Sequence, residues 1–360
     1  MRAHYFALAF SLVGLAASSN PHWENPSEKY MDVYKDYIDA TCPVSAGRVK
    51  HFVYFARDRE SLRHHPLLQH ERFEGAQVMY AWAELEPAKD DYDFSAIESD
   101  YEYLKSKGKK LFVQLQDATF STSYRAVPPY LLSEEFDGGA IHQRGDNDEP
   151  EGWVAKRWNE KVRQRFARLL GELGKQFDGK IEGINLQESA IGVTSKDDSS
   201  FTPQKYADAV KYNMLALRRA FPDSTTMQYA NFMPGEWLPW EDEGYLRSIY
   251  RYGEEIGVGL GAPDLMVERK GQLNHAIALM HENEYSVPLG IAVQDGNYIG
   301  QTGSVNTVVE DRKNLVPLLH AFATDFMRVD YMFWVNQQPY FEEDVLPCFS
   351  SRSQSGQRRS

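Results

Sequence analysis

Cysteine is scarce in this chain of 360 residues, and the motifs that hold metal ions or nucleotide phosphates are missing. The only two cysteines, Cys42 and Cys348, lie too far apart in the sequence to form a CxxC redox or zinc motif. No GxGxxG or GxxxxGK[ST] sequence occurs, so a glycine-rich turn that cradles phosphates is not expected. These absences argue against a zinc-finger protein and against a nucleotide-dependent enzyme.

Positive charge is also in short supply. The chain has 39 lysines and arginines against 52 aspartates and glutamates, and its formal net charge is −13. Nucleic-acid binding draws on a basic face that attracts phosphates, so this balance argues against a nucleic-acid partner.

Long apolar runs are absent except at the start. Residues 5–17 are almost wholly apolar, follow Arg2 and end in Ser18-Ser19-Asn20, which predicts a secretory signal peptide over residues 1–19. The run is too short to span a bilayer, and no later run is longer. We therefore expect export to the extracellular space or the periplasm, with no membrane segment after signal cleavage.

The middle of the chain alternates short apolar runs with helical patterns. A helix is predicted after Thr202-Pro203, because Thr is a good N-cap and Pro suits the first helical position. Such alternation predicts an α/β fold with a parallel sheet, and eight units predict a single-domain (β/α)8 TIM barrel over residues 20–348. A doubly wound open sheet is the alternative, and residues 144–151 are interpreted as an acidic surface loop. The eight predicted strands are residues 51–56, 76–81, 110–115, 181–186, 226–230, 257–261, 289–293 and 331–335.

The ends of the predicted barrel leave two questions open. Cys42 precedes the first strand and Cys348 follows the last, and those regions are neighbours in a closed barrel. In an exported protein they could form a disulfide, and two buried free thiols are the alternative. Residues 349–360 are polar and predict a disordered tail.

In a TIM barrel the active site is built at the carboxyl ends of the strands. Carboxylates, amides and aromatic rings follow the predicted strands, with no Ser-His pair and almost no histidine. Amides and carboxylates bind hydroxyl groups, aromatic faces stack on sugar rings, and glycoside hydrolysis needs two carboxyl groups. A carbohydrate substrate therefore fits these strand ends best, and the reaction needs no cofactor.

Residues 76–116 resemble the second and third strands of clan A glycoside hydrolases, which include cellulases and β-galactosidases. The shared features are Trp82, Glu86-Pro87 after the second strand, Tyr92-Asp93-Phe94 at a helix start, and Gly108 before the third strand. The resemblance extends over residues 53–338. It implies a TIM-barrel glycosidase that acts on a β-linked oligo- or polysaccharide.

In that clan the acid/base is a Glu at the end of strand four, usually directly after Asn. Here Glu188 takes this place, although Gln187 precedes it and Asn185 lies three residues before it. The clan's nucleophile is a Glu at the end of strand seven, where this sequence has Gln294 and Asp295 instead. We assign Asp295 as the provisional second carboxylate.

The departure at strand seven leaves alternatives open. Asp117, Asp264 and Glu84 are substitute second carboxylates, and a secreted carbohydrate-binding pseudoenzyme is the rival function. A metal-dependent barrel hydrolase is a lesser rival. By position, the residues expected to bind substrate are Trp82 and Trp334 as stacking platforms, with Gln116, Asn185, Gln187, Asn231, Tyr298 and Asn336 as hydroxyl partners.

Overall fold

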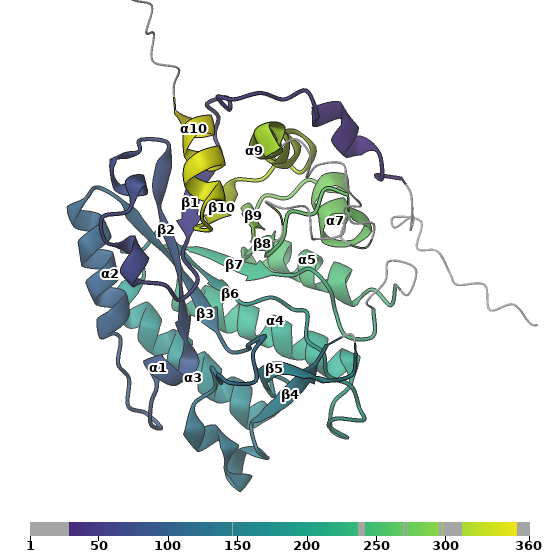
Figure 1. Ribbon diagram of the computed structural model, residues 1–360. Coiled ribbons are helices and arrows are strands. Elements are labelled where there is room, and N and C mark those ends of the chain that lie inside the picture. Colours follow the sequence, from purple (N-terminus) through teal and green to yellow (C-terminus); the bar gives the residue numbers. More distant parts are fainter. Residues whose placement is uncertain are drawn as a thin grey trace, which may run out of the picture.

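Eight parallel strands close into a barrel in the computed structural model, which describes residues 29–145, 147–236, 242–268, 271, 273–294, 297 and 312–350. The order around the barrel is β1-β10-β9-β8-β7-β6-β3-β2 (Figure 1). This closure confirms the predicted (β/α)8 fold and excludes the doubly wound sheet. The barrel strands are β1 (Lys50–Tyr54), β2 (Phe73–Ala81), β3 (Lys110–Gln116), β6 (Gly183–Leu186), β7 (Thr225–Tyr229), β8 (Gly259–Ala262), β9 (Leu289–Val293) and β10 (Tyr331–Val335).

The interior of the barrel is filled by aromatic rings that face glycines. Phe112 packs edge-to-face against Phe52 and Phe333, with ring centroids 5.8 and 5.0 Å apart. On the facing strands a Cβ at Gly183 would lie 2.7 Å from the Phe112 ring, and one at Gly290 would lie 2.7 Å from the Met227 side chain. Gly183 therefore has no room for a side chain, because the Thr225 carbonyl and the Phe112 ring occupy the space, and at Gly290 a side chain would have to displace Met227.

Helices surround the barrel, as the alternating pattern predicts. Thr202 caps the helix that begins at Pro203, and its side chain accepts a hydrogen bond from the Lys205 N–H. The α-helices are α1 (Trp82–Leu85), α2 (Ser95–Ser106), α3 (Glu160–Phe177), α4 (Pro203–Ala220), α5 (Tyr245–Ile256), α7 (Ala278–Glu282), α9 (Arg312–Ala321) and α10 (Leu346–Phe349). Short 3-10 helices lie at Val33–Tyr37, Glu60–Leu62, Pro66–Gln69, Pro129–Leu132 and Glu134–Phe136, and π-helical turns lie at Leu273–Ile277, Phe322–Phe326 and Phe341–Val345. Within the described part of the chain, no helix is long and apolar enough to cross a bilayer.

A hairpin interrupts the alternation between β3 and α3. Strands β4 (Ala140–Arg144) and β5 (Pro150–Ala155) pair antiparallel, and they lie in the lower part of the view in Figure 1. Our interpretation of residues 144–151 as a surface loop was wrong at both ends, because those ends belong to the strands. The sequence did not indicate this hairpin, because the stretch is rich in Asp and Glu, which are uncommon in strands.

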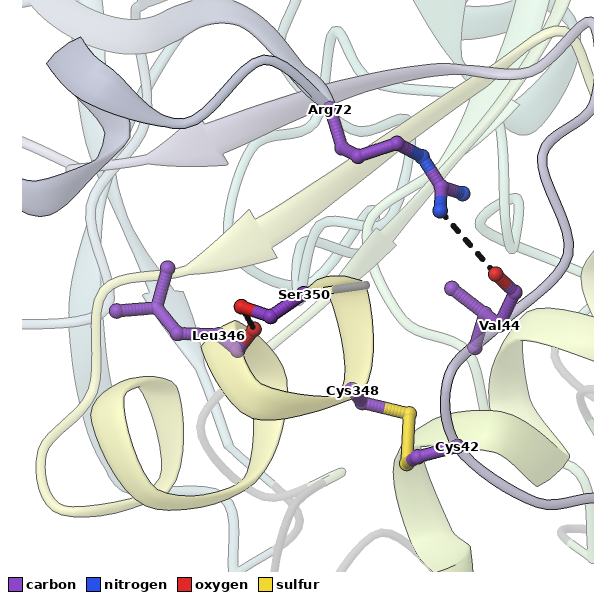
Figure 2. Close-up of a disulfide and its surroundings, with 6 residues drawn as sticks. All are labelled: Cys42, Val44, Arg72, Leu346, Cys348 and Ser350. Carbon is purple, nitrogen blue, oxygen red and sulfur yellow. Dashed lines mark hydrogen bonds between the residues drawn. A yellow bond between two sulfur atoms is a disulfide. The ribbon is translucent and has the colours of Figure 1, made fainter. Parts of the chain in front are cut away.

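The two ends of the described chain are joined by a disulfide between Cys42 and Cys348 (Figure 2). Beside it, the Val44 N–H donates to the Cys348 carbonyl oxygen (2.9 Å), and Arg72 donates to the Val44 carbonyl (3.1 Å). Phe349, which we placed in the polar tail, is instead buried among the core rings. The predicted signal peptide and the rest of the tail lie outside the described residues.

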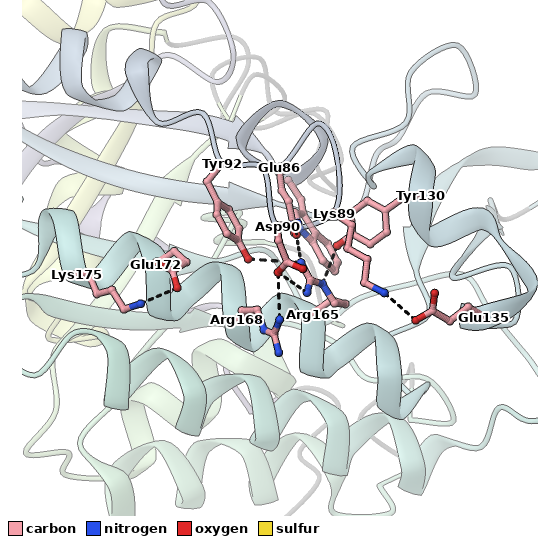
Figure 3. A network of polar contacts seen from close by, with 11 residues as sticks. Glu86, Lys89, Asp90, Tyr92, Tyr130, Glu135, Arg165, Arg168, Glu172 and Lys175 are labelled. Atoms are coloured by element: carbon pink, nitrogen blue, oxygen red, sulfur yellow. Dashed lines mark hydrogen bonds and ion pairs between the residues drawn. The ribbon is translucent and has the colours of Figure 1, made fainter.

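A buried ion pair fixes the loop after β2 to α3. Glu86 is fully buried and pairs with Arg165, and it also accepts hydrogen bonds from the Trp82 indole (2.9 Å) and the Asp90 backbone N–H (3.1 Å). Arg165 in turn donates to the Tyr130 hydroxyl oxygen at 3.0 Å (Figure 3). Every oxygen of the buried carboxylate is thus satisfied, which makes Glu86 part of the scaffold.

Removing one partner of this pair should destabilise the protein. We expect Arg165→Met to lower the free energy of unfolding by about 3–5 kcal/mol, because it leaves the Glu86 charge buried without a positively charged partner. The double variant with Glu86→Gln should cost less than the single variant, since the stranded charge is gone. Urea denaturation measures both, and a cost below about 1 kcal/mol for Arg165→Met would show that the pair is not essential.

Candidate active site

Glu188 lies at the mouth of the barrel, two residues after the end of β6. Its side chain is partly buried, and its Oε2 atom accepts a hydrogen bond from the Asn231 Nδ2 atom, which follows β7, at 2.7 Å. Loss of contact with water raises the pKa of Glu188 to about 7, and the negative charges of Asp264 and Glu151 act in the same direction. The Asn231 hydrogen bond and the Arg157 charge oppose the increase.

The backbone around Glu188 is held by a buried cation. Arg157, which follows β5, donates from Nη1 to the Glu188 carbonyl oxygen at 3.0 Å. Its Nε and Nη2 atoms donate to the two carboxylate oxygens of Asp117 at 2.7 and 2.6 Å. The Tyr206 hydroxyl accepts from Arg157 (2.6 Å) and donates to the Ser189 carbonyl (2.8 Å). Asp117, a substitute carboxylate in our sequence analysis, is therefore engaged in supporting Glu188.

The two amides that precede Glu188 have structural partners. Asn185 is fully buried inside the barrel, where its Oδ1 atom accepts from the Gln77 side chain at 3.0 Å. The Gln187 Oε1 atom accepts from the backbone N–H groups of Asp117 and Ala118 at 3.1 and 2.9 Å, which joins the ends of β6 and β3. Our prediction that Asn185 and Gln187 bind sugar hydroxyls was wrong, because both amides are buried and bonded to other parts of the barrel.

Neither predicted tryptophan platform presents a ring face to solvent. Trp82 is 1% exposed, packs edge-to-face against Phe166 and donates its indole N–H to Glu86. Trp334 is 0% exposed and donates to His51 Nδ1 at 3.2 Å, on the helix-facing side of β10. Both predictions were wrong. Side chains alternate between the two faces of a strand, and in β10 it is Phe333 that points into the barrel.

Two other predicted residues lie at the ends of their strands. Gln116 ends β3, is 7% exposed, and its Oε1 atom has no hydrogen-bond partner among the described residues. Asn336 follows β10, and its Oδ1 atom is 3.0 Å from His65 Nε2. The Gln116 Oε1 atom is itself buried, so the role of Gln116 as a hydroxyl partner stays a prediction, whereas Asn336 is held by His65.

Of the candidates for the second carboxylate, the structure describes Glu84, Asp117 and Asp264. Asp295 and Tyr298 lie outside the described residues. Glu84 is exposed and accepts from the Tyr124 hydroxyl at 3.1 Å. Asp264 follows β8, is partly buried, and lies close enough for its charge to raise the pKa of Glu188. Of the three substitute carboxylates, Asp264 is thus the one whose charge raises the pKa of Glu188.

The arrangement is suited to proton transfer. A partly solvent-accessible carboxyl group with a pKa near 7 keeps its proton near neutral pH and can donate it to a bound molecule. Among the described residues, no three His, Cys, Asp or Glu side chains are grouped so that they could hold a metal ion.

Sequence reasoning missed Arg157, because it follows a hairpin strand rather than a barrel strand. It also missed Phe120, four residues beyond β3, whose side chain is 54% exposed. Its exposure is a property of the structure, but its place in the loop after a predicted strand is a signal that the sequence contains.

Comparisons with known proteins place the fold. No protein-family model matches the sequence, and no curated protein matches it. Among solved structures, the catalytic domain of a β-amylase from Paenibacillus polymyxa is similar, with a TM-score of 0.54, 9% identity, and coverage of 80% of this chain and 93% of that one. A GH5_18 from Bifidobacterium longum subsp. infantis matches with a TM-score of 0.51, 11% identity, and coverage of 79% and 69%. The chain therefore shares its barrel fold with these proteins.

The electrostatic account of Glu188 can be tested by titration. We expect Asp264→Asn to lower the pKa of Glu188, because a like charge is removed, and Asn231→Ala to raise it, because a hydrogen bond to the charged form is lost. NMR of ¹³C-labelled glutamate measures the value, with Glu188→Gln identifying the signal. Glu102→Gln, on the exposed face of α2, should leave it unchanged. A pKa near the ordinary 4.5 in the unaltered protein would contradict the burial of this carboxyl group.

Proposed function

We propose that the protein is a glycoside hydrolase that cleaves a β-linked glycan, with Glu188 as its general acid. The observation that carries this proposal is the raised pKa of Glu188 at the mouth of the barrel, beside the hydrogen-bonding side chain of Asn231. The acid of such a reaction must hold its proton until the glycosidic oxygen leaves. The barrel fold, shared with a β-amylase and with a GH5_18, supports a glycoside hydrolase, and the β-linkage rests on the resemblance of residues 76–116 to clan A.

In the proposed reaction the protonated Glu188 donates its proton to the leaving oxygen as the bond to the anomeric carbon breaks. A second carboxylate then either attacks that carbon or activates a water molecule that does so. Asp295 is our assignment from its place after β9, and Asp264 is the alternative supported by its electrostatic effect on Glu188. The Asn231 amide, which donates to Glu188 and accepts from the Ala190 N–H, would position this acid.

We also propose that the protein is exported. The predicted signal peptide over residues 1–19 supports this proposal, and so does the Cys42–Cys348 disulfide, since disulfides persist in oxidising compartments.

A glycan-binding protein without catalysis is the second candidate. The sequence favours it at one position, because Gln294 directly follows β9 where clan A enzymes carry their nucleophile. An amide there could bind a hydroxyl but could not form a covalent intermediate.

The general acid is tested by sugar release from β-glucans, mannans, xylans and galactans. Glu188→Gln should lower kcat by about 10²–10⁴-fold, since the amide cannot supply a proton. Glu102→Gln, the same change at an exposed site, should retain full activity. Activity that survives Glu188→Gln would move the chemistry elsewhere in the barrel, and saturable binding without any release would favour the non-catalytic candidate.

The pH profile tests the same acid and identifies its partner. Activity should fall as the pH rises above about 7, because Glu188 must be protonated to act and loses its proton there. Asp264→Asn and Asp295→Asn are then compared. The variant of the true second carboxylate should lose activity at every pH, whereas loss of a purely electrostatic neighbour at 264 should only move the alkaline limb to lower pH. An alkaline limb that is the same in all three proteins and lies far from 7 would contradict the role of Glu188.

A further inference from the structure

A groove with a volume of about 650 Å³ begins two residues beyond Glu188, at Ala190. It runs between the β4–β5 hairpin and residues 190–197, which follow the loop that carries Glu188. Its walls include Phe120, Gln143, Arg144, Glu151, Ala190 and Lys196. None of our assigned catalytic or hydroxyl-binding residues lines it.

Hydrogen bonds join the walls of this groove to one another. Gln143 is 1% exposed, and its amide donates to the Thr119 carbonyl at 2.6 Å and accepts from the Gly192 N–H at 3.3 Å. The Arg144 N–H donates to the Gly192 carbonyl at 2.8 Å, and a Cβ at Gly192 would lie 1.9 Å from the Arg144 oxygen. The hairpin thus contacts both neighbouring loops closely, and the groove is preformed.

An aromatic ring stands exposed at the groove. Phe120 is one of three large hydrophobic side chains that are exposed in the described part of the chain, with Ile38 and Tyr212. Of these, only Phe120 lines this groove. Polar walls around an exposed ring are the surface that a sugar needs, because the ring covers its C–H face while the walls bind its hydroxyls.

The groove residue Ala190 is linked to Glu188 through Asn231. The Asn231 amide donates to the Glu188 carboxylate at 2.7 Å, and its Oδ1 atom accepts from the backbone N–H of Ala190, a groove residue, at 3.3 Å. Glu151, also a groove residue, is near enough for its charge to act on Glu188. The Ala190 end of the groove therefore lies near the Glu188 carboxyl group.

The charges of the lining favour an uncharged ligand. Three carboxylates, Asp148, Glu151 and Asp197, outnumber the two cations, Arg144 and Lys196, and Arg144 is paired with Asp197 at 2.6 Å. No cation in this set is in excess over the carboxylates, so a uronate or a sulfated sugar would meet net negative charge.

We propose that this groove binds a neutral sugar unit of the substrate, stacked on Phe120, next to the glycosidic bond at Glu188. This inference rests on the proposed function and names its substrate class as a neutral glycan long enough to reach from the groove to the barrel mouth.

The test measures binding without turnover, in Glu188→Gln protein. Isothermal titration with neutral β-linked oligosaccharides of two to six units identifies the tightest ligand. Adding Phe120→Ala should weaken its binding by about tenfold, the worth of one aromatic contact, and should leave the binding of a monosaccharide unchanged. Tyr212→Ala, which removes an exposed ring on α4, is the matched control and should have no effect. Oligouronides of equal length should bind more weakly than the neutral ligand.

The outcomes separate the groove from the proposed reaction. Weakened binding with Phe120→Ala, in a protein whose unaltered form releases no sugar, would support the groove and overturn the hydrolase. Hydrolysis by the unaltered protein with no effect of Phe120→Ala on oligosaccharide Kd or KM would overturn the groove and leave the hydrolase. Absence of binding by every neutral oligosaccharide would also overturn the groove.

Discussion

The buried pair between Arg157 and Asp117 is the constraint on which the candidate site depends. Three separate parts of the chain meet there: the end of β3, the segment after the β4–β5 hairpin, and the loop that carries Glu188. A buried cation is stable only when its hydrogen bonds are satisfied, and Arg157 meets this condition with Asp117, Tyr206 and the Glu188 carbonyl. The Glu188 backbone is therefore fixed while its carboxyl group remains at the edge of solvent.

This fixed position explains the electrostatics of Glu188. The guanidinium group of Arg157 contacts the backbone of Glu188 rather than its carboxylate, and it is already paired with Asp117. Partial burial and the charge of Asp264 therefore prevail, and the pKa rises to about 7. The same hairpin that leads to Arg157 also forms one wall of the Phe120 groove. One insertion between β3 and α3 thus supports the carboxyl group and shapes the surface beside it.

The sequence predicts the fold well because its signals are local. All eight barrel strands are short apolar runs that overlap the observed strands, and Thr202-Pro203 marks the start of α4. Glu188 and Asn231 were found as the polar residues that follow β6 and β7, and the structure brings them within hydrogen-bond distance. A position just after a barrel strand is therefore a good guide to the mouth of the barrel.

The rule that residues near the end of a barrel strand line its mouth fails in two cases. In one, the side chain lies on the outer face of the strand, and in the other it bonds to a part of the chain that is distant in the sequence. Trp334 is adjacent to a strand end, but it lies on the outer face of β10, and one residue of register separates the two faces. Gln187 is next to Glu188, yet its amide is taken up by backbone groups of β3's end, which lie about 70 residues earlier in the chain. Arg157 could not be found from position alone, because its role arises from contacts with three segments that only folding brings together.

The most direct test of this account is a crystal structure of the Glu188→Gln protein with a neutral β-linked oligosaccharide. The account predicts a glycosidic oxygen within hydrogen-bond distance of the side chain at position 188, with one sugar ring lying over Phe120. A sugar chain bound away from the barrel mouth, or one whose glycosidic oxygens all lie out of reach of position 188, would contradict it.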